Sequence, residues 1–152
     1  MTKNKKIILL VEDDVPLLEA AKLKLEKNGF EVISARSVER AISSDIMESD
    51  IGKITADSVE KVLKHLENLE KVDAIWLDHN LIGKENGLDF VAKFKSNGGR
   101  FLNVPIFVVS NTSSVELRKS YEKIGVRNYF VKAEHRLENI VREIRIALNF
   151  DS

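Results

Sequence analysis

Short, unbroken apolar runs that each end in acidic residues constrain the fold of this chain most. The run 7–11 is followed by Glu12 and Asp13, and the run 74–77 is followed by Asp78. Strands that are buried on both faces of a parallel sheet have this continuous apolar character. Ligand sites in open sheets of this kind form at the carboxyl ends of the strands. The two runs therefore predict a parallel sheet that gathers carboxylates at one edge.

Strand patterns and helical patterns alternate along the rest of the chain. We expect strands over five segments, 6–12, 30–35, 73–78, 104–110 and 127–132. We expect helices over 15–27, from about Ser37 onward, over 87–96, over 113–124 and over 134–149. Strict alternation predicts an α/β fold, a doubly wound five-stranded parallel sheet with helices on both faces. The 152 residues favour a single domain, 1–152.

The segment 45–71 is longer than one crossover helix requires. Asp57 and Glu60 stand at the spacing of a capping box, and valine and leucine then recur at helical spacing. We expect an extra amphipathic helix here, or a lengthened second helix that is broken near Gly52. This helical insertion between strands two and three would cover the sheet edge, or it would bind a partner or a second copy of the chain.

Composition narrows the class of function. Lys plus Arg and Asp plus Glu both number 24, and this balance argues against nonspecific nucleic-acid binding. The chain has no cysteine, which rules out disulfides and thiolate metal sites. The N-terminal apolar run is too short for a signal-peptide core or a membrane span. We therefore expect a soluble cytoplasmic protein that is not bound to membranes, and the sequence leaves its oligomeric state open.

The acids at the sheet edge predict a metal site. Carboxylates that converge on one spot repel one another unless a cation lies among them. The hard cation that suits oxygen ligands is Mg²⁺. The sequence therefore predicts a divalent ion next to one reactive aspartate, Asp78.

An acid pair, an aspartate, a hydroxyl and a lysine follow one another at successive predicted strand ends. The segments that carry this order are 8–14 (ILLVEDD), 77–78 (LD), 86–90 (NGLDF), 104–110 (VPIFVVS) and 129–132 (YFVK). With them the chain resembles the receiver domain of two-component response regulators, from residue 6 to about 148 apart from 45–71. The resemblance implies a flavodoxin-like fold with strand order 2-1-3-4-5. Because the residues after 149 are too few for a DNA-binding module, we expect a stand-alone receiver without an output domain.

The same resemblance implies a role for each matching residue. Asp78 matches the acceptor of a phosphoryl group that comes from a phosphohistidine on a histidine kinase or histidine phosphotransfer protein. Glu12, Asp13, Asp78 and Asn80 match the positions that hold Mg²⁺, the last through its backbone carbonyl. The protein would then be a signal-transduction phosphoacceptor rather than an enzyme, although it would assist its own phosphorylation and dephosphorylation.

Two further groups complete the implied switch. Ser110 and Lys132 match the residues that bind phosphoryl oxygens. Ser110 and Tyr129 match a pair that moves on phosphorylation and changes the surface offered to a downstream protein target. A local charge that biases a two-state element is a physically sound switch.

Departures from the family pattern leave a second hypothesis open. Ala133 follows Lys132 where proline is usual, and Asn111 follows Ser110 where a small residue is usual. Both favour a receiver-fold interaction module that is not regulated by phosphorylation. A magnesium phosphohydrolase is disfavoured because Asn80 cannot shuttle a proton. A dinucleotide-binding protein is disfavoured because the turn after the first strand is acidic and has no glycine.

Several of these side chains also have ordinary structural interpretations. Ser110 could cap the following helix, Tyr129 could be a static aromatic, and Lys132 could be a solvated strand-end lysine. Either Asp13 or, better, Asp14 could cap the first helix. Strand alternation predicts that the side chain of His79 points away from Asp78 and packs elsewhere. Trp76 should lie in the core, and His65 and His135 should face solvent from helices.

Overall fold

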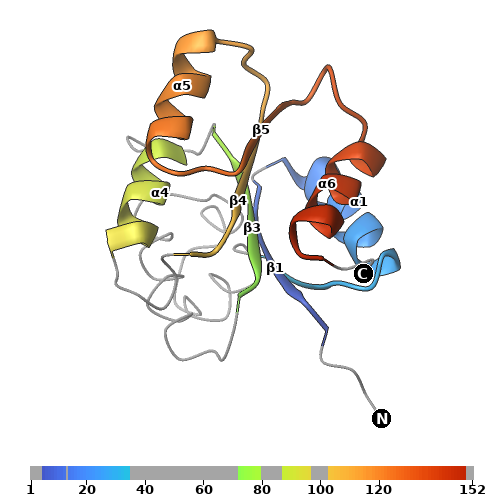
Figure 1. The fold of residues 1–152 in the computed structure, drawn as a ribbon. Helices are drawn as coiled ribbons and strands as arrows, with labels where there is room; N and C mark the ends of the chain where they lie inside the picture. Colours follow the sequence, from blue (N-terminus) through green and yellow to red (C-terminus); the bar gives the residue numbers. More distant parts are fainter. Residues whose placement is uncertain (1–4, 13, 35–71, 80–86, 97–102, 150–152) are drawn as a thin grey trace, which may run out of the picture.

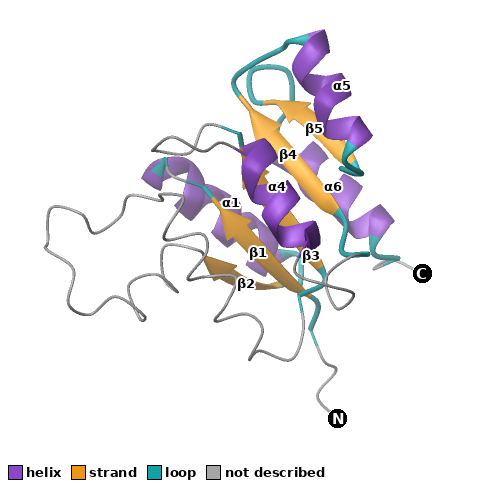
Figure 2. Cartoon of the chain, turned by 90° about the vertical axis from the view of Figure 1, so that its left-hand side faces the viewer, coloured by secondary structure: helices purple, strands orange, loops and turns teal. Residues whose placement is uncertain are grey.

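The five predicted strands form one parallel sheet (Figure 2). The computed structural model describes residues 5–12, 14–34, 72–79, 87–96 and 103–149. The strands are β1 (Ile7–Val11), β2 (Glu31–Ser34), β3 (Ala74–Asp78), β4 (Ile106–Ser110) and β5 (Asn128–Val131). Their spatial order is β2-β1-β3-β4-β5, and every neighbouring pair is parallel. The predicted fold class and strand order are therefore confirmed.

Helices cover both faces of this sheet. The described helices are α1 (Val15–Lys27), α4 (Gly87–Ser96), α5 (Val115–Lys123) and α6 (Leu137–Ala147). Helices α4 and α5 lie on one face, and α1 and α6 lie on the other (Figure 1). None of the described helices has the length and apolar character that a membrane span needs. The helix predicted from Ser37 and the insertion 45–71 lie outside the described residues.

Strand alternation sends successive side chains to opposite faces. On β1, Leu9 packs in the core toward α4 and α5, whereas Leu10 packs in the core toward α1 and α6. Strands β3 and β4 are buried along their whole length, as continuous apolar runs predict. Trp76 is fully buried on the α1/α6 side, which confirms its predicted place in the core.

The observed elements are shorter than the predicted ones at several ends. Strand β4 begins at Ile106 rather than at residue 104, because Pro105 has no N–H to donate to the sheet. Helix α5 begins at Val115, where the Ser114 side chain accepts a hydrogen bond from the N–H of Leu117 at 3.1 Å. These corrections move no predicted site residue to another element.

The start of α6 was predicted three residues too early. The chain makes a turn after β5, in which the N–H of Glu134 donates to the Val131 carbonyl at 2.9 Å. His135 lies in the loop before Leu137, and its ring packs edge-on against Phe130. The prediction that His135 faces solvent from a helix was therefore wrong. Residues 134–136, which the apolar pattern assigned to the helix, belong instead to the turn and loop that precede it.

Candidate functional site

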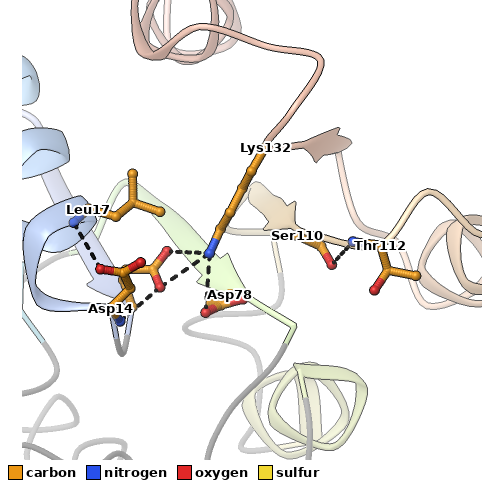
Figure 3. A network of polar contacts seen from close by, with 7 residues as sticks. Asp14, Leu17, Asp78, Ser110, Thr112 and Lys132 are labelled. Atoms are coloured by element: carbon orange, nitrogen blue, oxygen red, sulfur yellow. Dashed lines mark hydrogen bonds and ion pairs between the residues drawn. The ribbon is translucent and has the colours of Figure 1, made fainter.

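Three charged side chains meet at the carboxyl edge of the sheet. Glu12 follows β1, Asp78 ends β3 and Lys132 follows β5. Glu12 is fully buried, Asp78 is 4% exposed and the Lys132 side chain is 16% exposed. The Lys132 Nζ lies 3.3 Å from Glu12 Oε1 and 3.5 Å from Asp78 Oδ2. One ammonium group therefore lies against two buried carboxylates (Figure 3).

Strand alternation explains why these three side chains meet. Each lies two residues beyond a core residue that faces α1 and α6, namely Leu10, Trp76 and Phe130 respectively. Because alternate residues share a face, the three tips lean to the same side of the sheet. Lys132 is thus part of an ion-paired cluster, and the alternative of a solvated strand-end lysine is wrong.

The two carboxylates share a site that favours a proton or a cation. The pKa of Glu12 is raised to about 8, most of all by burial and then by its hydrogen bond to Asp78 and the Asp78 charge. Lys132 and the N–H of Asp14 act in the opposite direction. Two acids this close cannot both be charged cheaply without a further positive charge.

The donor set fits a magnesium ion. Glu12 and Asp78 supply oxygen donors, which are the ligands that this hard cation prefers. Within the described ranges no three acidic, histidine or cysteine side chains lie close enough together to hold a metal by themselves. Asp13 and Asn80, the other two predicted ligands, lie outside the described residues. Mg²⁺ would supply the positive charge that two buried carboxylates at one place favour.

Asp14 has a structural role beside this cluster. Its side chain accepts a hydrogen bond from the N–H of Leu17 at 3.3 Å and caps α1, which confirms the predicted cap. Its own N–H donates to Glu12 Oε2 at 3.2 Å. The two described acids after β1 thus have different roles. Glu12 belongs to the charged cluster, and Asp14 caps the N-terminus of α1.

Ser110 lies at the same edge but on the other side of the sheet. It is fully buried. It lies two residues beyond Val108 on the same strand and therefore points to the same face, toward α4 and α5. Its Oγ accepts a hydrogen bond from the N–H of Thr112 at 3.1 Å, toward which it points in Figure 3. Ser114 rather than Ser110 caps α5, so the helix-cap interpretation of Ser110 is wrong. The hydroxyl proton of Ser110 remains able to donate while the oxygen accepts.

Tyr129 is tied to the loop that follows Ser110. Its hydroxyl donates to the Thr112 carbonyl at 2.6 Å, and the residue as a whole is 8% exposed. The Arg118 guanidinium lies 5.3 Å from the centre of the Tyr129 ring. The structure therefore connects Tyr129 to Ser110 through a single residue, Thr112. Whether Tyr129 moves stays a prediction.

Known structures share this architecture. A receiver domain protein of a response regulator from Methanospirillum hungatei matches with a TM-score of 0.70 at 20% identity, over 96% of this chain and 95% of that one. A response regulator receiver protein from Pseudomonas putida matches with a TM-score of 0.69 at 19% identity, over 95% and 98%. The chemotaxis protein CheY4 of Vibrio cholerae matches with a TM-score of 0.69 at 17% identity, over 93% and 98%.

The chain has the receiver-domain fold of response regulators. No family model matches the sequence, and no curated protein matches it either. The predicted resemblance is therefore confirmed at the level of the fold. The low sequence identities agree with the departures that the sequence shows from the usual receiver pattern.

Two of those departures have visible consequences in this receiver fold. The Lys132–Ala133 peptide bond is trans, the form that residues other than proline strongly favour. The N–H of Lys132 still donates to the Ser110 carbonyl at 2.7 Å, so the β5 tip stays joined to β4. Asn111 and Ala133 are both exposed. Neither departure displaces Lys132 from the two acids.

One feature of this receiver fold was only half foreseen from the sequence. His79 does point away from Asp78 and packs elsewhere, as strand alternation predicted. Its Nδ1 lies 2.6 Å from the hydroxyl of Tyr121, a buried residue on α5. Tyr121 itself was overlooked. A tyrosine in a helix segment in which most residues are charged, VELRKSYEK, is the signal that pointed to a buried polar contact.

Proposed function

We propose that this protein is a phosphorylation-dependent signalling switch in which Asp78 accepts a phosphoryl group. The donor would be a phosphohistidine on a histidine kinase or histidine phosphotransfer protein. The altered surface would then contact a downstream protein target. The contact of Lys132 Nζ with both Asp78 and Glu12 is the observation that supports this proposal most strongly.

The chemistry is a transfer between two nucleophiles. A carboxylate oxygen of Asp78 attacks phosphorus and forms an acyl phosphate, while the bond from phosphorus to the donor nitrogen breaks. The bonding electrons return to the imidazole, which takes up a proton from solvent. Such transfers depend on positioning and charge neutralisation more than on covalent help from the protein.

Side chains around Asp78 have the chemistry that this transfer requires. Lys132 carries a compact positive charge that can pair with Asp78 and then with a phosphoryl oxygen. Ser110 can donate its hydroxyl proton to another phosphoryl oxygen. Glu12 and Asp78, together with Asp13 and the Asn80 carbonyl, would hold Mg²⁺. The bound ion neutralises negative charge on the acceptor and on the transferring group.

Phosphorylation would act on the loop between β4 and α5. It adds negative charge and acceptor oxygens at Asp78. Ser110 and the N–H groups beyond it would be drawn toward those oxygens. Because Thr112 is held by the hydroxyl of Tyr129 at 2.6 Å, a moving loop would release or carry that ring. The surface near α5 and β5 would change as a result.

Labelling by a small acyl phosphate tests the proposal. The protein is incubated with acetyl phosphate with and without Mg²⁺, and intact mass is measured by mass spectrometry. We expect the mass increase of one phosphoryl group in the presence of Mg²⁺ only. Asp78→Asn should remove it. Asp14→Asn is the matched control, because asparagine is an equally good helix cap and the exposed side chain lies outside the cluster.

The alternative function, a receiver-fold interaction module without phosphorylation, predicts a different result. It expects no labelling and no effect of Mg²⁺ on the fluorescence of Trp76. Exposed Asn111 and Ala133 are the residues that favour it. Labelling of Asp78→Asn at the level of the unaltered protein would also contradict the phosphoacceptor role.

A further inference from the structure

Three elements meet around the hydroxyl of Tyr121. The Tyr121 side chain is fully buried on α5, and its hydroxyl lies 2.6 Å from Nδ1 of His79, the residue after β3. The two rings are also packed edge to face, with centroids 5.6 Å apart. At the start of α4, a Cβ on Gly87 would overlap the same hydroxyl. The first turn of α4, the tip of β3 and the middle of α5 therefore share one contact point.

The backbone that leaves Asp78 is fixed from two sides at this point. The carbonyl of His79 accepts a hydrogen bond from the N–H of Gly87 at 3.0 Å. The ring of His79 is held by Tyr121. Around the position that a Gly87 Cβ would take, the His79 Cα lies 3.1 Å away and the Asp78 carbonyl oxygen 3.3 Å away, so the backbones are in close approach. A side chain larger than hydrogen at position 87 would push these groups apart.

We propose that His79 and Tyr121 are a positioning pair that holds the Asp78 carboxylate in its reactive orientation and joins it to α5. The proposal deepens the proposed function and rests on it. Asp78 is the last residue of β3, so its carboxylate direction depends on the backbone on both of its sides. Pairing with β1 and β4 fixes the side that precedes it. The His79–Tyr121 contact fixes the side that follows.

The pair also reaches the part of the fold that responds to phosphorylation in the proposed function. The ring of Tyr121 packs against that of Tyr129, with centroids 5.7 Å apart. Tyr129 in turn holds the Thr112 carbonyl. A continuous set of contacts therefore runs from the residue beside the acceptor, through the buried face of α5, to the loop after Ser110. Because coupling between sites is reciprocal in free energy, the proposal predicts that a change at Tyr121 alters Mg²⁺ binding at Asp78.

Magnesium affinity, measured by calorimetry or by Trp76 fluorescence, tests the pair without requiring phosphoryl transfer. Tyr121→Phe removes the hydroxyl and keeps the ring. We expect it to raise the Mg²⁺ dissociation constant by about three- to tenfold, the effect of one net hydrogen bond. The rate of labelling by acetyl phosphate at subsaturating Mg²⁺ should fall by a similar factor. His79→Asn places an amide group near the position of Nδ1 and should retain most of the affinity, whereas His79→Leu should behave like Tyr121→Phe.

Asn28→Ala is the matched control for stability. Asn28 caps the far end of α1, where it accepts from Arg145 and donates to the Lys24 carbonyl. This substitution should lower the unfolding free energy about as much as Tyr121→Phe does. It should leave the Mg²⁺ dissociation constant within twofold of that of the unaltered protein. The pair has no positioning role if Tyr121→Phe and His79→Leu also stay within twofold. If the unaltered protein neither binds Mg²⁺ nor becomes labelled, the proposed function itself fails. This result differs from the one that rules out the positioning pair alone, in which the unaltered protein and both variants bind Mg²⁺ equally.

Discussion

The two faces of the sheet are packed with different chemistry. The α1/α6 face is filled by aliphatic and aromatic side chains such as Leu25, Phe107 and Ile144. The α4/α5 face contains two buried tyrosines, Tyr121 and Tyr129, whose hydroxyls both make short polar contacts.

Buried polar groups and apolar contacts respond differently to a change of charge. A methyl group gains little from moving, whereas a hydroxyl can exchange one partner for another of similar energy. The α1/α6 face is also joined at its rim by Lys24 and Glu138, whose Nζ and Oε1 lie 2.9 Å apart. We infer that α1 and α6 form the static side of the molecule and that α5 lies on the responsive side.

Truncating one fully buried residue on each face separates stability from function. Ile144→Ala and Tyr121→Ala should each cost about 2–5 kcal/mol of unfolding free energy, since both leave cavities. Chemical denaturation measures this loss. Only Tyr121→Ala should also weaken Mg²⁺ binding at temperatures where both variants are folded. Equal loss of Mg²⁺ affinity in the two variants would break the comparison between the faces.

The cluster of Glu12, Asp78 and Lys132 at the carboxyl edge of the sheet should make the stability of the protein depend on pH. The pKa of Glu12 rises from 4.5 to about 8 on folding, chiefly through burial. The folded state therefore binds a proton that the unfolded state loses, and metal-free stability should fall as pH rises from about 5 to 8. We expect a decrease on the order of 2–4 kcal/mol. Denaturation at a series of pH values measures it.

Glu12→Gln is the control for this pH dependence. The amide is neutral at every pH in the range, so the slope between pH 5 and 8 should flatten. Saturating Mg²⁺ should reduce the slope in the unaltered protein as well, because binding then releases the proton. A slope that persists in Glu12→Gln would assign the effect to another group.

The close approach at Gly87 predicts an interaction between two substitutions. Gly87→Ala should cost about 1–3 kcal/mol, because the new methyl group overlaps the Tyr121 hydroxyl. In the Tyr121→Phe background the same change should cost less, since that hydroxyl is gone. A double-mutant cycle in denaturant measures the difference. Strict additivity would mean that the two residues do not share this space.

The smallest expected effect concerns the hydroxyl of Tyr129. Tyr129→Phe removes the donor to the Thr112 carbonyl and should cost about 1 kcal/mol. Amide exchange should accelerate locally between β4 and α5 rather than across the sheet. Unchanged exchange at residues 111–114 would show that this bond does not hold the loop.

Sequence patterns predicted the sheet and most of the acidic cluster because both follow from local rules. Continuous apolar runs identify buried strands, and their carboxyl ends must lie at one edge. Because successive side chains of a strand point to opposite faces, the sequence also predicts that Lys132 and Asp78 lean to one side of the sheet and Ser110 to the other. The contact between His79 and Tyr121 could not be predicted, because it depends on how closely α5 approaches α4. Turn geometry after β5 likewise overrode the helical pattern that begins at residue 134.

Amide hydrogen exchange with and without a phosphoryl mimic tests the central claim most directly. Beryllofluoride with Mg²⁺ would bind at Asp78 in place of a phosphoryl group. We predict altered protection in the loop after Ser110, along α5 and around Tyr129, with α1 and α6 unchanged beyond the first turn of α1. Equal changes on both faces, or no change in the loop after Ser110 when the mimic is bound, would contradict the account.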